Sequence, residues 1–254
     1  MLLAIDVGNT NMVIGIFEEE TLKTSWRIST DQQRTIDEYG ILIRNLITSS
    51  GLVVQKINGI CISCVTPPLI AVLRVMADRY FHQKPLFVEP GIKTGMPILY
   101  ENPQEVGADR IVNSVAAISK FGGPAIIVDF GTATTFDAVS EKGEYLGGVI
   151  APGVTISSEA LFERAAKLPR VEIKEIEKII GKNTVESMQA GLFYGYMGLV
   201  EGILQQMKKV LAGDVTVVAT GGIAGLFQKK CPSIHKLDKT LTLDGLRIIW
   251  EKNN

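Results

Sequence analysis

Two stretches of the chain follow one pattern, and this internal repeat constrains the fold more than any other feature of the sequence. LLAIDVGNTNMVIGIF begins at Leu2, and AIIVDFGTATTFDAV begins at Ala125. Each consists of an apolar run, then Asp-x-Gly, then Asn or Thr residues, then a second apolar run. Turn residues between two such runs predict a β-hairpin. The chain is therefore expected to carry two equivalent hairpins, one in each half.

The segments after each hairpin repeat as well. In the first half we expect three strands, at 2–5, 12–17 and 22–28, and then a helix at 35–50 with a Thr35–Glu38 capping box. A buried strand at 57–65 and a helix from 67, opened by two prolines, come next. A helix from about Glu105 to Lys120 follows. In the second half we expect strands at 125–129, 134–139, 144–150 and 215–222, with helices between and after them. The pattern predicts a duplicated α/β chain with domains at 1–122 and 123–254.

Composition excludes several classes of protein. The chain has 254 residues, 46% of them apolar and 21% charged, which suits one large globular domain or two ordinary ones. Its formal net charge is −1 without a block of Lys or Arg, so we expect no nucleic-acid partner. We find no signal peptide and no apolar run of membrane-spanning length, so we expect a cytoplasmic protein without a membrane partner. Three cysteines, at 61, 64 and 231, are expected to be reduced and structural.

Four glycines lie on one face of the helix expected over about 185–211, at positions 191, 195, 198 and 202. Each costs roughly 1 kcal/mol relative to alanine inside a helix, so four of them indicate the close approach of another helix. That helix can belong to the same chain, or to a second copy related by two-fold symmetry. The sequence leaves both possibilities open.

The repeated hairpin loops have the chemistry of a phosphate-binding site. Each offers backbone N–H groups next to a glycine, Thr hydroxyls and one carboxylate at a strand end, Asp6 or Asp129. Backbone amides and hydroxyls suit phosphate oxygens, and carboxylates suit the hard cations that accompany a triphosphate. One such loop alone is weak evidence, because Asp-Gly turns close many hairpins. Two at equivalent positions predict a nucleotide held in a cleft between two similar domains.

Several motifs resemble known families. Paired Asp-Gly hairpins, with VVATGGIAGLF at 217–227 as an adenosine segment, are similar to the actin, sugar kinase and heat-shock ATPase superfamily. DVGNT at the start, GADR at 107–110, DFGTATT in the second hairpin and GGVIAPG at 147–153 together resemble type III pantothenate kinase. The resemblance covers the chain in order. It implies a duplicated actin-like (ribonuclease H-like) fold and ATP-dependent phosphorylation of pantothenate, the first step of coenzyme A biosynthesis.

The same resemblance implies roles for particular residues. ATP is bound by Asp6, Val7, Gly8, Asn9, Thr10, Asn11, Met12, Val13 and Thr132. Pantothenate is bound by Tyr100, Gly107, Ala108, Asp109, Arg110 and Thr184, with Asp109 as the catalytic base. Asp129 is the ligand of a monovalent cation, K⁺ or NH₄⁺, and Mg²⁺ accompanies ATP. The family also implies a homodimer.

Alternatives remain for some of these roles and for the function. Arg110 can engage either the substrate carboxylate or the transferring phosphoryl group, and Thr184 lies in a plausible helix cap. His82 and His235 lie outside every motif and are expected at the surface. A nucleotide-driven switch, or a phosphohydrolase that needs no acceptor, would use the same two loops. Either would leave the GADR segment without a role, so a kinase is favoured.

Overall fold

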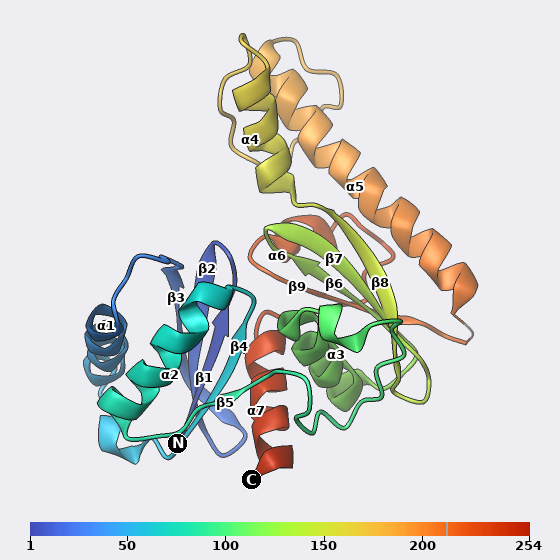
Figure 1. Cartoon of the computed structure of the whole chain (residues 1–254). Helices are drawn as coiled ribbons and strands as arrows, with labels where there is room; N and C mark the ends of the chain where they lie inside the picture. Colours follow the sequence, from blue (N-terminus) through green and yellow to red (C-terminus); the bar gives the residue numbers. More distant parts are fainter. Residues whose placement is uncertain (212) are drawn as a thin grey trace. The chain divides into compact units, whose positions relative to one another are not determined.

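The computed structural model describes residues 1–211 and 213–254, and it divides into two compact units, each built on one five-stranded sheet (Figure 1). The first unit comprises Met1–Met96, Glu101–Ala116 and Thr240–Asn254, and the second comprises Pro97–Tyr100 and Ala117–Lys239. Within the described residues, no helix is both long and apolar enough to cross a membrane.

The sheet of the first unit has the strand order β3-β2-β1-β4-β5. Its strands are β1 (Leu2–Val7), β2 (Asn11–Glu18), β3 (Thr21–Ser29), β4 (Gly59–Cys64) and β5 (Leu86–Phe87). The first three form the predicted antiparallel meander, while β4 pairs with β1, and β5 with β4, in parallel. Because the parallel connections need crossovers, helices follow β3 and β4.

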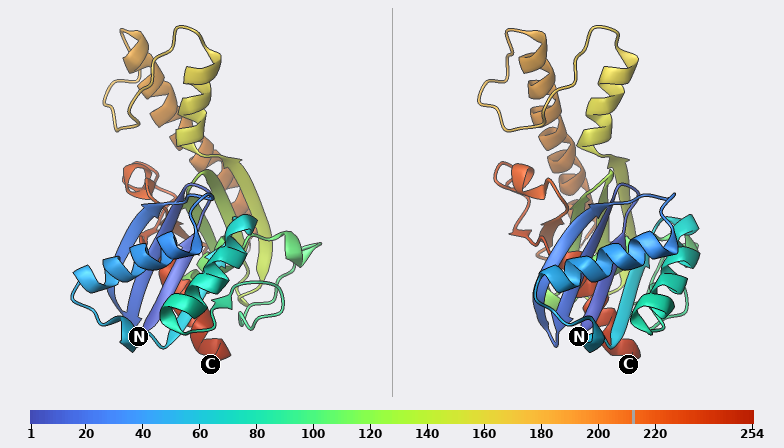
Figure 2. Two further views of the ribbon diagram at one scale, coloured as in Figure 1. Left: turned by 60° about the vertical axis from the view of Figure 1, so that its left-hand side comes forward. Right: turned by 90° about the vertical axis from the view of Figure 1, so that its left-hand side faces the viewer.

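Helices cover both faces of this sheet. Figure 2 shows α1 (Ile36–Ser49) lying across one face together with α2 (Pro67–Phe81). Their apolar side chains form one core with alternate residues of the strands, such as Ile14 and Ile16. Gly15 points to the opposite face, where its missing side chain makes room for Leu243 of α7 (Leu241–Asn253).

Helix α3 (Ala108–Phe121) packs against α7 within the first unit. A side chain on Gly245 of α7 would collide with the backbone carbonyl of Val112 of α3, so the glycine permits this close approach. The helix begins three residues later than predicted. Residues Pro103–Glu105 instead form a short 3-10 turn capped by Asn102, and Gly107 separates that turn from the helix.

The sheet of the second unit repeats the plan of the first. Its order is β10-β9-β6-β7-β8, with β6 (Ala125–Phe130), β7 (Ala133–Val139), β8 (Tyr145–Pro152), β9 (Thr216–Thr220) and β10 (Lys236–Leu237). β6 pairs antiparallel with β7 and parallel with β9, as β1 pairs with β2 and β4. The predicted duplication is therefore confirmed at the level of topology.

Three helices accompany the second sheet: α4 (Val154–Arg164), α5 (Thr184–Val210) and α6 (Ala224–Gln228). One face of α5 is buried with the sheet in an apolar core that includes Phe193, Tyr196 and Phe227. Asn183 caps α5 by accepting a hydrogen bond from the amide of Glu186 at 2.9 Å.

The units differ from the predicted domains 1–122 and 123–254 at three places, of which one is the boundary itself: residues 117–122, at the end of α3, lie in the second unit. The last helix, α7, lies in the first unit because it covers the face of the first sheet that α1 and α2 leave open. The four residues Pro97–Tyr100 lie in the second unit because they pair with β8. The placements of α7 and of Pro97–Tyr100 both depend on contacts between residues far apart in sequence, which local sequence patterns do not encode.

Candidate active site

The first hairpin loop joins β1 to β2. Asp6 is the fifth residue of β1 and is half-buried, whereas Asn9 and Thr10 at the tip are exposed. The amide of Gly8 donates to the carbonyl of Asn11 at 3.0 Å, which closes the turn. The loop thus holds a carboxylate at the strand end and polar groups open to solvent at its tip.

Two threonines outside the motif hold this loop in place. The hydroxyl of Thr30 donates to the carbonyl of Gly8 at 2.7 Å, and the hydroxyl of Thr66 donates to the same oxygen at 3.4 Å. Sequence reasoning missed both residues. Thr30 directly follows β3, whose last residue pairs with Asn11, so its position in the hairpin register was the available signal.

The second hairpin loop joins β6 to β7 and is one residue shorter. Asp129 is again the fifth residue of its strand, and in β6, as in β1, the aspartate is half-buried while the other residues are buried. Thr132 at the tip is exposed, and the amide of Gly131 donates to the carbonyl of Ala133 at 3.1 Å. The two aspartates are therefore equivalent, while their loops are not identical.

Gly153, the last glycine of GGVIAPG, lies against the tip of the second loop. Its amide donates to the carbonyl of Thr132 at 3.1 Å. A Cβ on Gly153 would lie 2.6 Å from the carbonyl oxygen of Gly131 and closer still to that of Thr132. Only a residue without a side chain fits here while the loop keeps its position.

Gly221, in the segment after β9, lies against the end of β6, where the second loop begins. It has φ of +99°, and a Cβ there would lie 2.7 Å from Oδ1 of Asp129 and 2.6 Å from the carbonyl oxygen of Phe130. The backbone conformation and the lack of space both require glycine. Two oxygens thus lie next to a space that a side chain would fill.

Asp109 lies in the first turn of α3, where a carboxylate also interacts favourably with the helix dipole. Its Oδ1 accepts a hydrogen bond from the amide of Arg110 at 2.9 Å. The same oxygen lies 2.6 Å from where a Cβ of Gly107 would be, so the glycine of GADR leaves room for the carboxylate. Burial raises the pKa of Asp109, and the hydrogen bond and charge of Arg110 oppose this only in part.

The side chain of Arg110 is buried, at 7% exposure, and its backbone carbonyl accepts a hydrogen bond from the hydroxyl of Ser114 at 2.8 Å. Tyr100, the other predicted pantothenate residue in this part of the sequence, is half-buried and belongs to the second unit. Of the predicted substrate residues, Arg110 belongs to the first unit and Tyr100 to the second.

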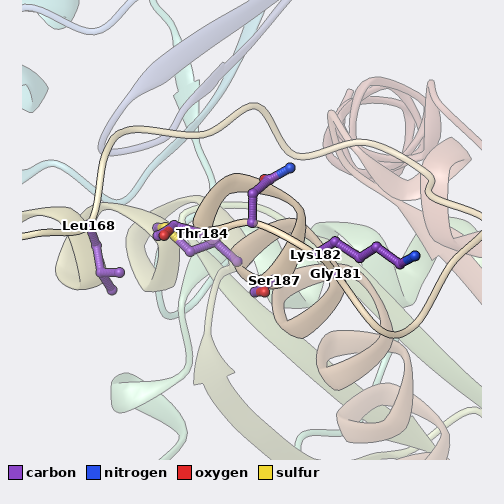
Figure 3. Close-up of a pocket in the computed structure, with 7 residues that line it drawn as sticks. Leu168, Gly181, Lys182, Thr184 and Ser187 are labelled. Atoms are coloured by element: carbon purple, nitrogen blue, oxygen red, sulfur yellow. The ribbon is translucent and has the colours of Figure 1, made fainter.

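Thr184 lies at the start of α5 and lines a cavity of about 550 Å³ (Figure 3). The other lining residues are Leu168, Gly181, Lys182, Asn183, Ser187 and Met188. Thr184 is exposed, and its neighbour Asn183 provides the helix cap. Thr184 is therefore free to contact a ligand, although no other predicted site residue lines the cavity.

Comparison with known proteins identifies the family. The family model described as "Type III pantothenate kinase" matches residues 2–206. The chain is 57% identical over 263 residues to the type III pantothenate kinase of Koribacter versatilis, covering 100% of this chain and 96% of that protein. The chain belongs to the type III pantothenate kinase family. Its reaction is therefore phosphoryl transfer from ATP to pantothenate, the first step of coenzyme A biosynthesis, and the ATP brings a divalent metal ion.

Solved structures place this pantothenate kinase in the actin-like fold. A Campylobacter jejuni structure described as a Baf family transcriptional activator has a TM-score of 0.62 at 20% identity, covering 99% of this chain and 98% of that one. An Arthrobacter inorganic polyphosphate/ATP-glucomannokinase has a TM-score of 0.50 at 12% identity and covers 98% of each chain. At these identities the likeness concerns the fold alone, and it confirms the predicted duplicated actin-like architecture.

The cysteines and histidines of the pantothenate kinase show no sign of a catalytic role. All three cysteines are free, and burial raises the pKa of Cys61 to about 12 and that of Cys231 to about 11, which makes poor nucleophiles. His82 and His235 are exposed, as predicted, and Nδ1 of His235 accepts a hydrogen bond from the amide of Val217 at 3.1 Å.

Proposed function

We propose that Asp109 is the catalytic base of the pantothenate kinase reaction, because its carboxylate combines partial burial, a raised pKa and a fixed orientation over Gly107. Pantothenate is bound by the GADR segment, Gly107 to Arg110, together with Tyr100 and Thr184. ATP is bound by the first loop, Asp6 to Val13, and by Thr132 of the second. The exposed polar residues at the two loop tips, Asn9, Thr10 and Thr132, support the ATP assignment.

In this mechanism the carboxylate of Asp109 takes the proton of the pantothenate hydroxyl as that oxygen forms a bond to the γ-phosphorus of ATP. The bond from phosphorus to the β,γ-bridging oxygen breaks, which leaves ADP and 4′-phosphopantothenate. Such reactions depend chiefly on positioning and charge stabilisation. The raised pKa makes Asp109 a stronger base than an ordinary aspartate, and the buried guanidinium of Arg110 offers a planar pair of donors to a carboxylate or phosphoryl group.

A coupled assay of ADP release tests this function. With ATP and Mg²⁺ in potassium buffer, we expect turnover only when pantothenate is present. Turnover that does not depend on pantothenate would favour the alternative of a nucleotide-driven switch or an acceptor-independent phosphohydrolase on the same fold. We also propose a cytoplasmic location, which the near-neutral charge and the two soluble substrates support.

The oxygens beside Gly221 support a monovalent cation at Asp129. A carboxylate oxygen and the carbonyl oxygen of Phe130 both border the space where a side chain of residue 221 would lie. Alkali cations are hard ions that take such oxygen ligands, as in channel filters built from carbonyls. When bound, K⁺ or NH₄⁺ would supply positive charge beside the second loop. Asp129 and Phe130 are the residues that would hold it.

Replacing Asp129 by Asn is expected to weaken activation by potassium, because the carboxylate charge is lost while the size of the side chain is kept. The measurement compares kcat/KM in potassium and in sodium buffer for the variant and the unaltered enzyme. Asp214→Asn, which changes an exposed aspartate of the same unit, serves as the control. An unchanged ratio of the potassium and sodium rates in the Asp129 variant would contradict the assignment.

We propose that the enzyme is a homodimer with the glycine face of α5 at the subunit contact. Gly191, Gly195, Gly198 and Gly202 are exposed, and apart from adjacent residues and the nearby backbone of α5 itself, no atom of the described residues lies within 4 Å of where their side chains would begin. Packing of another helix of this chain against these glycines is therefore not found. The remaining explanation is the one that the sequence left open, a second copy.

The variant Gly195→Leu tests the dimer. Sedimentation velocity is expected to show a smaller species for the variant than for the unaltered protein, because a leucine side chain would hold two helices apart. Circular dichroism controls for folding, and the exposed position should tolerate leucine within one chain. Sedimentation of the variant as the same oligomer would rule out this face as the contact.

A further inference from the structure

The segment Pro97–Tyr100 lies in the second unit, although the chain on both sides of it belongs to the first. It runs beside the outer edge of β8. The amide of Leu99 donates to the carbonyl of Tyr145 at 2.8 Å, and the amide of Tyr145 donates to the carbonyl of Pro97 at 2.9 Å. Both backbone polar groups of Tyr145 thus hold the segment that ends in Tyr100.

The ring of Tyr100 lies against two residues of β8. Its centroid is 6.3 Å from that of the Tyr145 ring, with an angle of 55° between the ring planes. Gly147, the first residue of GGVIAPG, has φ of +118°, and a Cβ there would lie 3.3 Å from Cε2 and 3.4 Å from Cδ2 of Tyr100. The glycine therefore leaves room for the Tyr100 ring, and Tyr145 limits how that ring can tilt.

A buried carboxylate fixes Tyr145 at its other end. The hydroxyl of Tyr145 donates to Oδ1 of Asp137 at 2.7 Å, and both residues have 0% exposure. The hydroxyl of Thr135 donates to Oδ2 of Asp137 at 3.3 Å. A hydrogen bond to a carboxylate is roughly twice as strong as a neutral one, and burying a carboxylate is costly unless it has donors. Rotation of the Tyr145 ring is therefore strongly opposed.

We propose that Tyr145 is a positioning residue for pantothenate, and that Asp137 and Gly147 serve the same purpose. Asp137 fixes the orientation of the Tyr145 ring, Tyr145 and Gly147 fix the ring of Tyr100, and Tyr100 contacts the substrate. This inference rests on the proposed function, because it requires Tyr100 to bind pantothenate. Its consequence is an effect on the KM for pantothenate that is not shared by the KM for ATP.

The first test is the variant Tyr145→Phe, which removes only the hydroxyl that donates to Asp137. We expect the KM for pantothenate to rise roughly 10-fold through misplacement of the Tyr100 ring. The KM for ATP and the kcat at saturating substrates should stay close to those of the unaltered enzyme. A matched control is Tyr80→Phe, which removes a tyrosine hydroxyl that donates to Asp37, also at 2.7 Å, in the first unit. Equal rises in both KM values would overturn the proposal.

A double-mutant cycle then shows whether Tyr145 acts through Tyr100. In the Tyr100→Ala background, Tyr145→Phe should cause no further rise in the KM for pantothenate, whereas independent effects would multiply. Multiplying effects refute the positioning role while leaving Tyr100 as a substrate residue. If Tyr100→Ala alone leaves the KM for pantothenate unchanged, the assignment of Tyr100 is wrong, and the positioning role is wrong with it.

The variant Gly147→Ala gives a separate test if Tyr145→Phe does not fold. It keeps the hydrogen bond between Tyr145 and Asp137 but puts a methyl group against the Tyr100 ring, at a φ that alanine rarely adopts. A rise in the KM for pantothenate of roughly 10-fold or more, with an unchanged KM for ATP, would support the proposal. An unchanged KM for pantothenate in a folded variant would overturn it.

Discussion

Replacing Asp109 by Asn is expected to lower kcat by roughly 10²–10⁴-fold, the usual contribution of a general base. Asparagine keeps the shape of the side chain and can still accept the hydrogen bond from the amide of Arg110, so the start of α3 should stay intact. What it loses is the ability to take the proton of the pantothenate hydroxyl. Steady-state ADP release at saturating ATP and pantothenate measures the loss.

The control for this experiment is Asp78→Asn, which changes an exposed aspartate on α2 of the same unit, outside every motif. Its kcat should match that of the unaltered enzyme. A near-normal kcat for the Asp109 variant would mean that another group, or water, takes the proton. Thermal unfolding of both variants shows whether any loss of rate reflects a loss of folded protein.

The pH profile gives an independent reading of the same carboxylate. Only the deprotonated form of Asp109 can act as a base, so activity should fall as pH falls through its pKa. Because burial raises that pKa, the acid limb of kcat/KM should lie at a higher pH than for an ordinary aspartate. The Asp109→Asn variant should lack this limb. A limb that persists in the variant belongs to a different group.

Replacing Gly153 by Ala is expected to lower kcat/KM for ATP by on the order of 10²-fold, the effect that a misplacement of about 1 Å can have. The added methyl group would collide with the carbonyl oxygens of Gly131 and Thr132, both of them backbone atoms that cannot swing away. Either the second loop or the start of α4 must shift. Initial rates over a range of ATP concentrations measure the effect.

The variant Gly51→Ala provides the control, because it adds the same methyl group at an exposed glycine of the first unit, where that group meets no neighbouring atom within 4 Å. Its φ of +74° costs an alanine some stability, but the KM for ATP should not change. If Gly153→Ala behaves like this control, the second loop does not need its present position to bind ATP.

Much of the fold could be predicted because it is encoded locally. Three features are each determined by residues that are close together in sequence: the capping box at Thr35, the glycine after the first long helix, and the two repeated hairpins. The structure contains all three. The start of α3 was misplaced because polar residues around Asn102 form a turn of their own that competes with the helix.

The candidate site could be predicted only where a motif marks it. Asp109 and Gly107 are neighbours in sequence, and their packing explains the spacing of GADR. The contacts of Tyr100 with Tyr145 and Gly147 join residues more than 40 positions apart, and nothing in either segment alone indicates the other. Such contacts between distant residues can be recognised only from the folded structure, in which the segment of Tyr100 pairs with β8.

The placement of α7 has a consequence for the order of events during synthesis. A chain emerges from the ribosome beginning at its N-terminus, and domains usually fold as they appear. Here the first unit includes Thr240–Asn254, which are synthesised after every residue of the second unit. The unit whose synthesis begins first is thus completed after the other, and a nascent chain stalled before Thr240 would expose the apolar surface that Leu243 and Trp250 otherwise cover.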